Sequence, residues 1–419
     1  MVRHQVAGAL IGGVLALALA CSGCDPTSGG SSGAPTAAAS ARPAATQAPA
    51  SPQAPKPLSC AAQVFSRMTT AQRAGQLFAV GIAGSPGSVV ARAVASYHFG
   101  SLMFGTTTAA SLAEIRQVTA ADQALASRAA TARVRFFIAA DTEGGEVQRL
   151  RGPGFAAIPS AVTQGELAPG TLKREAAGWG RELKQAGVNL DLAPVMDVVP
   201  PGTAQQNQPI GALRREFGSD PRTVATHGVA FLRGLRQAGV AATAKHFPGL
   251  GRVTGNTDLT AGVVDPVTAP GDPYLGSFQA AVDAGVPFVM VSLASYPRID
   301  PRHLAVFSSR TMRTLLRTRM HFGGVIISDD MGAAAAVASL SPAARAVSFL
   351  SAGGDMILSE SLPAAAAMDA AVVAKMKRDP AFRSDADAAV MRILVAKQAY
   401  GLLPELWCAT PRSAGTPRP

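Results

Sequence analysis

The sequence predicts an α/β fold, a single (β/α)8 barrel of the TIM type, and three observations lead to that prediction. Short apolar runs alternate with helical patterns through most of the chain. Charged residues stand at the ends of several of these runs. The chain has 419 residues, 48% of them hydrophobic, so it can bury a core large enough for one barrel.

The candidate strands are short apolar runs bounded by turn residues, as expected of buried parallel strands. They are Gln76–Ile82, Gly100–Gly105, Phe136–Asp141, Asn189–Asp197, Ala241–Gly249, Phe288–Ser295, Gly323–Asp330 and Gly354–Ser359. Eight strands, each followed by a helix, favour a closed barrel with the helices outside it. An open doubly wound sheet is the alternative. The turn at Gly81–Gly87 argues against it, because this turn lacks the phosphate-binding glycine spacing and places Pro86 where a helix would begin.

The candidate helices lie between these runs, and several begin behind a Pro or a Ser/Asp cap and end in Ala-Gly. They are Val89–Tyr97, Leu112–Ala129, Leu172–Ala186, Thr223–Ala238, Leu275–Ala284, Thr311–Met320, Ala343–Ala352, Ala364–Lys377 and a final helix near Ala386–Tyr400.

The amino terminus predicts export. A positively charged start precedes the uncharged run Val6 to Ala20, which is too short to span a membrane as a helix. The run ends in small residues before Cys21, an arrangement that resembles a bacterial lipobox. We therefore expect residues 1–20 to be a lipoprotein signal peptide and Cys21 to be lipidated at the outer face of the cytoplasmic membrane. An ordinary cleavage site is the alternative, and Cys24 is a rival acceptor.

Residues 21–59, rich in Ser, Gly, Ala and Pro, predict a flexible tether, and residues 409–419 predict a disordered tail. The barrel is expected between them, over residues 60–408. Cys60 opens this region and Cys408 closes it, so an exported protein can join its two ends by a disulfide. Two separate buried thiols are the alternative.

The formal net charge of +11 would suit an acidic partner. However, Lys and Arg are scattered through the helical segments, and aromatic residues make up only 5% of the chain. The basic stripe and the stacking platform of nucleic-acid-binding proteins are both missing, so we expect no nucleic-acid partner.

Polar residues collect where the carboxyl ends of barrel strands would meet. The third run ends at Asp141, the fourth at Asp197 and the seventh near Asp329 and Asp330. The fifth ends at Lys245 and His246, followed by a loop with three Gly within ten residues. A single Asp at a strand end is more often a helix cap, but four charged strand ends together predict a functional site.

Five motifs resemble those of glycoside hydrolase family 3, and in particular its single-domain β-N-acetylglucosaminidases. Within that group, the chain resembles the lipoproteins of actinobacterial type. The motifs are Asp141-x-Glu143-Gly144-Gly145-x-Val147-Gln148-Arg149, Ala193-Pro194-Val195-x-Asp197, Arg215-x-Phe217-Gly218-x-Asp220-Pro221, Lys245-His246-Phe247-Pro248-Gly249-x-Gly251 and Ser328-Asp329-Asp330-Met331. The similarity runs from about residue 64 to about residue 403. The second sandwich domain of the family's β-glucosidases is not expected.

The resemblance implies a role for each matching residue. Asp329 corresponds to the nucleophile of a retaining glycosidase, and the neighbouring charges of Lys245 and Arg215 would keep it ionised. Asp330 is expected to be structural. The residues expected to hold sugar hydroxyls are Asp141, Arg149, Arg215, Lys245 and His246. A carbohydrate substrate is implied, with no cofactor and no metal ion.

The chain departs from the family on the loop after Lys245. The family's N-acetylglucosaminidases carry Asp-Ser-His there, with the His as acid/base, whereas this chain has Asn256-Thr257-Asp258. Leu250 also replaces a His common in the family. Asp258 is the candidate acid/base, because a retaining glycosidase needs a proton donor for the leaving oxygen. The alternative is that Asp258 is a turn residue and His246 or water supplies the proton.

Three classes of function follow. The first is a monomeric exo-β-N-acetylglucosaminidase that removes terminal GlcNAc from peptidoglycan fragments such as muropeptides. The second is another family 3 β-glycosidase, or a phosphorylase that uses phosphate in place of water. The third is a sugar-binding lipoprotein without catalytic activity.

Overall fold

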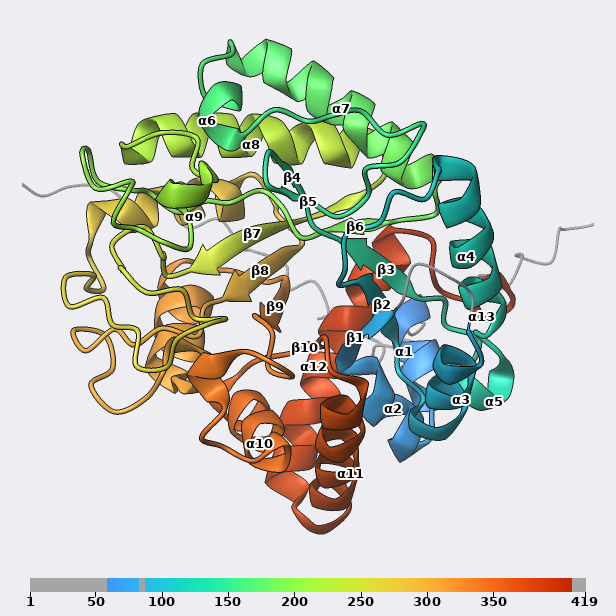
Figure 1. The fold of residues 1–419 in the computed structure, drawn as a ribbon. Helices are drawn as coiled ribbons and strands as arrows, with labels where there is room; N and C mark the ends of the chain where they lie inside the picture. Colours follow the sequence, from blue (N-terminus) through green and yellow to red (C-terminus); the bar gives the residue numbers. More distant parts are fainter. Residues whose placement is uncertain (1–58, 83–86, 409–419) are drawn as a thin grey trace, which may run out of the picture. The chain divides into compact units, whose positions relative to one another are not determined.

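The computed structural model describes residues 59–82 and 87–408 (Figure 1). The predicted signal peptide, both lipidation candidates, Cys21 and Cys24, most of the tether and the tail lie outside these residues. None of the helices in the described part is long and apolar enough to cross a membrane.

Eight parallel strands form the central sheet, in the order β10-β1-β2-β3-β6-β7-β8-β9. They are β1 (Phe78–Ile82), β2 (Ser101–Phe104), β3 (Phe137–Ala140), β6 (Leu190–Asp191), β7 (Ala241–Phe247), β8 (Phe288–Val291), β9 (Val325–Ser328) and β10 (Ile357–Ser359). A parallel bridge between Ile327 and Met356 joins the last strand in this order to the first. The sheet therefore closes on itself, and the predicted (β/α)8 barrel is confirmed.

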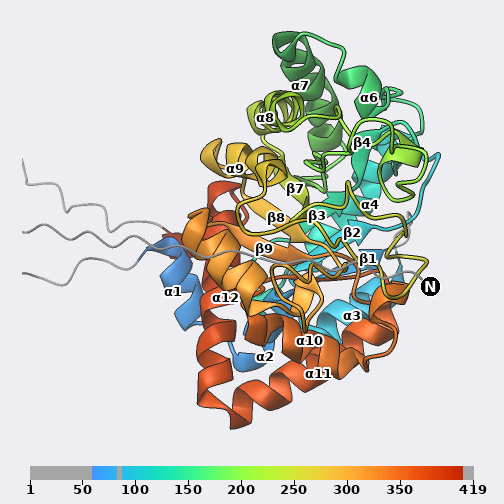
Figure 2. The same cartoon turned by 90° about the vertical axis from the view of Figure 1, so that its left-hand side faces the viewer.

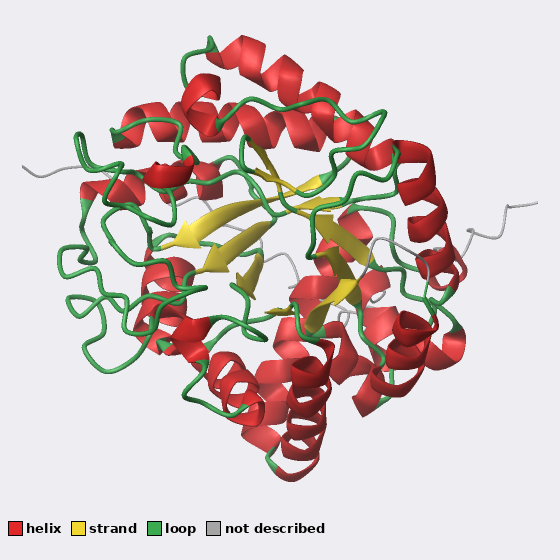
Figure 3. Ribbon diagram, viewed as in Figure 1, coloured by secondary structure: helices red, strands yellow, loops and turns green. Residues whose placement is uncertain are grey.

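Helices surround the strands, as the view coloured by secondary structure shows (Figure 3). The α-helices are α1 (Cys60–Ser66), α2 (Thr70–Gln76), α3 (Ser88–Tyr97), α4 (Leu112–Ala124), α5 (Arg128–Thr131), α6 (Ala161–Gln164), α7 (Pro169–Gln185), α8 (Pro221–Gln237), α9 (Gly276–Asp283), α10 (Pro342–Ala352), α11 (Leu362–Arg378), α12 (Pro380–Ala399) and α13 (Glu405–Cys408). A π-helix, η4, spans Arg310–Arg319. Short 3₁₀ turns are η1 (Gly211–Leu213), η2 (Pro273–Leu275), η3 (Ala305–Phe307) and η5 (Ala335–Val337).

The core fills both sides of the strands. Every residue of β2, β3, β7, β8, β9 and β10 is buried. Inside the core the Phe137 and Phe288 rings pack edge to face with centroids 5.2 Å apart. A parallel strand covered on both faces has no polar alternation, which explains why the candidate strands were visible as continuous apolar runs.

The structure corrects two predicted elements and adds a hairpin beside the site. The run Asn189–Asp197 is regular only over Leu190–Asp191, because Pro194 has no N–H to donate to the ladder. The predicted helix Leu112–Ala129 is two helices, α4 and α5. A small antiparallel hairpin, β4 (Thr142–Gly144) and β5 (Val147–Gln148), was not predicted and holds the Asp141 motif.

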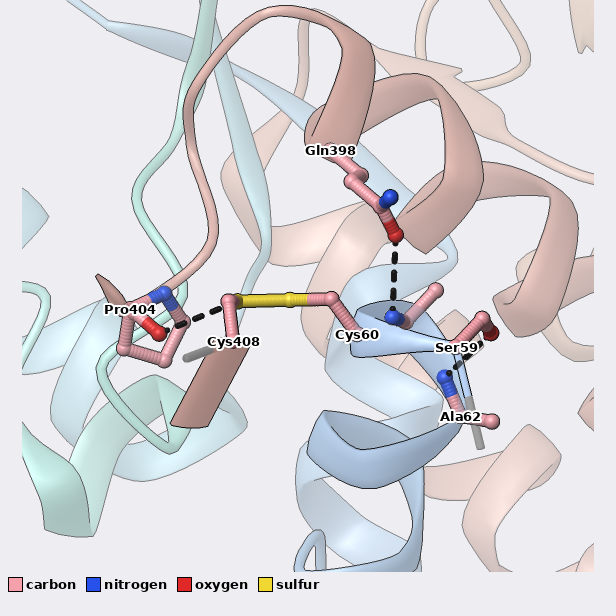
Figure 4. The surroundings of a disulfide bond; sticks show 7 residues. Ser59, Cys60, Ala62, Gln398, Pro404 and Cys408 are labelled. Carbon is pink, nitrogen blue, oxygen red and sulfur yellow. Dashed lines mark hydrogen bonds between the residues drawn. A yellow bond between two sulfur atoms is a disulfide. The ribbon is translucent and has the colours of Figure 1, made fainter. Parts of the chain in front are cut away.

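The two ends of the described chain are joined at the end of the barrel opposite the loops that follow the strands (Figure 2). Cys60, the first residue of α1, and Cys408, the last of α13, form a disulfide with their Cα atoms 4.7 Å apart (Figure 4). The amide of Ala61 donates to Gln398 Oε1 over 3.0 Å, which also binds α1 to α12.

We expect the variants Cys60→Ser and Cys408→Ser to unfold at a lower temperature than the wild type, with hydrolytic activity at 25 °C unchanged. A link between residues 348 positions apart restricts the unfolded chain, and such links typically contribute about 2–4 kcal/mol. Thermal unfolding followed by circular dichroism measures the change. Reduced wild type is the matched control and should unfold like the variants. Two free thiols in non-reducing mass mapping, or equal unfolding temperatures, would contradict the expectation.

Candidate active site

A pocket of about 280 Å³ opens at the carboxyl ends of the barrel strands. Loops that follow β3, β7, β9 and β10 all contribute to its wall. Its charged or titratable lining residues are Asp141, Arg149, Arg215, Lys245, His246, Asp258, Asp329, Asp330 and Glu360. All seven candidate site residues proposed from the sequence are among them, although they come from segments far apart in the chain.

Lys245 is held at the wall of the pocket by two carboxylates. Its ammonium lies 2.5 Å from Asp141 Oδ1 and 2.6 Å from Glu143 Oε1, and its side chain is 2% exposed. Burial alone would lower the pKa of Lys245, but the charges of Asp141 and Glu143 raise it above the usual value. Lys245 is therefore a fixed cation that can donate to a ligand without moving.

Arg215 is oriented by the same glutamate. Its Nε donates to Glu143 Oε2 over 2.8 Å and its Nη2 donates to Oε1 over 2.7 Å, the two-pronged geometry that a guanidinium and a carboxylate favour. Burial raises the pKa of Glu143, but the charges and hydrogen bonds of Arg215 and Lys245 outweigh that effect and lower it to about 2. Glu143 therefore stays ionised and positions both cations.

His246 is oriented from beneath by Asp197, which is fully buried. The imidazole Nδ1 lies 2.8 Å from Asp197 Oδ2, and the backbone amides of His246 and Leu250 both donate to Oδ1. With Nδ1 bonded to the carboxylate, Nε2 is the ring atom left for other partners, and Arg215 Nη2 lies 3.4 Å from it. Asp197 thus fixes both the ring and the loop that follows it.

Asp329 follows β9 directly, with its amide donating to Val291 O and its Oδ1 accepting from the Asp330 amide. The pKa of Asp329 is raised to about 6, because burial and the charge of Asp258 raise it by more than charge on His246 lowers it. The carboxylate is therefore ionised above about pH 6. From the sequence, Lys245 and Arg215 were expected to hold Asp329 ionised. Charge on His246 lowers the pKa of Asp329 more than Lys245 does, because Lys245 and Arg215 are both paired with Glu143.

Asp258 reaches the pocket because its loop is joined to the segment after β9. The carbonyls of Thr257 and Asp258 accept hydrogen bonds from the amides of Ala336 and Ala335, each over 3.0 Å. The base of the loop is held by Asn207, whose amide donates to Leu250 O and Val253 O over 2.7 Å. Asp258 itself is exposed, and its charge contributes to the raised pKa of Asp329.

Asp330 has the structural role expected from the sequence. Its carboxylate accepts from the amides of Gly332, Ala333 and Glu360 over 2.8–2.9 Å, and so ties the end of β9 to the end of β10. Within residues 59–82 and 87–408, no group of three His, Cys, Asp or Glu side chains is arranged to hold a metal ion.

The comparison with family models agrees with this geometry. Residues 69–396 match the glycosyl hydrolase family 3 N terminal domain. The chain belongs to glycosyl hydrolase family 3. The pocket at its strand ends is therefore the candidate active site of a family 3 glycoside hydrolase.

Several family 3 proteins are similar to this chain. A solved β-N-acetylhexosaminidase from Beutenbergia cavernae is 46% identical, with a TM-score of 0.78, over 79% of this chain and 99% of that one. A family 3 β-N-acetylglucosaminidase from Paenibacillus is 27% identical, with a TM-score of 0.72, over 80% of this chain and 63% of that one. A β-hexosaminidase from Xanthomonas oryzae is 37% identical over 246 residues, which are 57% of this chain and 71% of the relative.

From the sequence, no individual role in this family 3 site was assigned to three carboxylates, Glu143, Asp197 and Glu360. Glu143 and Asp197 stand inside quoted motifs, and the signal that could have singled them out is their charge within otherwise apolar, buried segments. Glu360 directly follows the eighth candidate strand, Gly354–Ser359, in the same position relative to its strand as Asp329 has to β9. The pattern of charged strand ends therefore extends to one strand beyond the four named from the sequence.

Proposed function

We propose that the protein is a retaining exo-β-N-acetylglucosaminidase that releases terminal GlcNAc from peptidoglycan fragments through a covalent intermediate on Asp329. The observation that carries the proposal is the position of Asp329. Its carboxylate lies on the wall of a pocket that also contains two fixed cations, Lys245 and Arg215, and the oriented ring of His246. The names of the relatives support the choice of sugar.

The size of the pocket supports an exo-acting enzyme. Its volume of about 280 Å³ is just below the range of small-molecule sites, which run from about 300 to 1,000 Å³. A single sugar ring suits such a pocket better than a polysaccharide chain. Fixed cations and carboxylates on its wall, among them Lys245 and Asp141, provide donors and acceptors for the ring hydroxyls.

The proposed reaction has two steps. The ionised carboxylate of Asp329 attacks the anomeric carbon, the glycosidic C–O bond breaks, and Asp258 gives its proton to the leaving oxygen. Asp258 then takes a proton from water, whose oxygen attacks the anomeric carbon and releases Asp329. Asp258 is preferred to His246 because it lies exposed on a rim loop, where the leaving group would exit, whereas Asp197 holds His246 against the wall.

We further propose that the enzyme is exported and anchored through a lipid on Cys21, as a monomer on the outer face of the cytoplasmic membrane. Support for export and for the lipid anchor comes from the sequence of residues 1–59 alone. Such a location would place the pocket where fragments of the cell wall are released.

A phosphorylase is the second candidate, since the loop lacks the family's acid/base His and a phosphate needs less help than water to attack. Turnover of an aryl β-N-acetylglucosaminide, followed with and without inorganic phosphate, separates the candidates. We expect release of free GlcNAc at a rate that phosphate does not change. Formation of GlcNAc 1-phosphate would identify the protein as a phosphorylase instead of a hydrolase. The absence of turnover in either buffer would favour a sugar-binding protein without catalytic activity.

A further inference from the structure

The pocket contains one carboxyl group that the proposed reaction does not use. Glu360 is the first residue after β10 and lines the same cavity as Asp329. Its amide donates to Asp330 Oδ1 over 2.9 Å, so the backbone at this point is tied to the segment that carries the nucleophile. The backbone of Glu360 is therefore held in a fixed position within the candidate active site.

The side chain of Glu360 extends over the mouth of the barrel. A Cβ atom placed on Gly105 would lie 3.3 Å from the carboxyl carbon of Glu360 and 3.4 Å from its Oε1. Gly105 follows β2, and in the sheet order β1 stands between β2 and β10. The carboxyl group thus crosses the end of β1 to reach β2, and the absence of a side chain at Gly105 leaves room for it.

The carboxyl group has charged neighbours, but no hydrogen-bonded partner among the residues that the structure describes. The pKa of Glu360 is raised to about 7, because burial, chiefly, and the charges of Asp330, Asp141 and Asp258 raise it by more than Arg149 lowers it. No described residue forms a hydrogen bond with the carboxyl oxygens, although Lys245, Arg215 and His246 are all held by carboxylates. The carboxyl of Glu360 can therefore accept a hydrogen bond from a ligand, and when protonated it can also donate one.

We propose that Glu360 is a sugar-binding residue, which hydrogen-bonds a hydroxyl of the ring seated at Asp329 and makes the pocket selective for that hydroxyl. Glu360 forms this part of the wall together with Asp141 and Arg149, whose Nε lies 3.8 Å from Asp141 Oδ2. The assignment rests on the proposed function, because that function seats a sugar ring in this pocket. A site built to bond a hydroxyl discriminates strongly against analogues that lack it, since its own polar group is then left without a partner.

The test is calorimetric binding of GlcNAc to the wild type and to Glu360→Ala, Glu360→Gln and Glu146→Gln. Glu146 is an exposed carboxylate of the loop between β4 and β5 that does not line the pocket, so Glu146→Gln is the matched control. We expect Glu360→Ala to weaken binding about tenfold or more, the order of one hydrogen bond to a polar group. Glu360→Gln, which keeps an acceptor oxygen, should lose less, and the control should bind like the wild type.

Deoxy sugars identify the contact. The 3-, 4- and 6-deoxy analogues of GlcNAc are each measured against the wild type and Glu360→Ala. For one analogue the variant should bind as well as the wild type, because the hydroxyl that Glu360 contacts is already missing. If Glu360→Ala binds GlcNAc as tightly as the wild type does, or weakens all three analogues as much as it weakens GlcNAc, the proposal is overturned.

A second variant leaves Glu360 in place. Gly105→Ala puts a methyl group 3.3 Å from the carboxyl carbon and should displace it, so it should weaken binding in the wild-type background but not in Glu360→Ala. An equal loss in both backgrounds would contradict the contact. Turnover is measured in parallel. If GlcNAc binding depends on Glu360 but the wild type hydrolyses no substrate, the proposed function alone is overturned. If the wild type hydrolyses the substrate and Glu360→Ala leaves hydrolysis unaffected, this inference alone is overturned.

Discussion

Replacement of Asp329 by Ala should abolish hydrolysis, by about four powers of ten or more, even for aryl glycosides with good leaving groups. No other carboxylate follows the same strand at the same position, and Asp330 is committed to three backbone amides. Steady-state turnover of an aryl β-N-acetylglucosaminide measures the loss. Residual activity above about a tenth of the wild-type rate would exclude Asp329 as the nucleophile.

The pH dependence gives an independent check on Asp329. Its pKa is raised to about 6, and the carboxylate must be ionised to attack, so kcat/KM should fall as the pH drops below about 6.

Asp329→Asn serves as a control for folding. A folded-state pKa above the usual 3.8 means that stability is lost as the pH rises from about 4 to 6, because the folded carboxyl holds its proton longer than the unfolded one does. The Asn variant should therefore unfold at a higher temperature than the wild type at pH 7.

Replacement of Asp258 by Asn should slow hydrolysis of a natural disaccharide by about two to four powers of ten, with a much smaller effect on an aryl glycoside whose leaving group needs no proton. Azide should partly restore turnover of the aryl substrate, because a small anion attacks the glycosyl-enzyme without the general base that water requires. The measurements are kcat/KM for both substrates with and without azide.

His246→Ala is the matched comparison for Asp258→Asn. His246 is bonded to Asp197 and lies beside Arg215, so its loss should weaken both substrates alike and should show no rescue by azide. A different pattern of rates would assign the acid/base role to His246. If Asp258→Asn leaves the disaccharide rate and the pH profile unchanged, while His246→Ala removes the alkaline limb, then His246 is the acid/base.

Local sequence was sufficient to predict the barrel, because strands buried on both faces leave continuous apolar runs, and helices leave caps and glycine stops. The errors occurred where a local rule competed with the pattern. Pro194 broke the ladder inside an apolar run, and Leu112–Ala129 was divided by the turn before Ser127, whose side chain caps α5. The hairpin after Asp141 is too short to leave a periodic signal.

The sequence by itself determined the order of the strand–helix units, the charged residues at their ends and the family to which the chain belongs. Only the tertiary structure decided which charge meets which. Glu143 forms ion pairs with both Lys245 and Arg215, and Asp197 bonds His246. The side chain of Glu360 extends over β1 to Gly105. Such partnerships join residues tens to hundreds of positions apart. They depend on how the closed barrel staggers its strand ends, and no local pattern records that stagger.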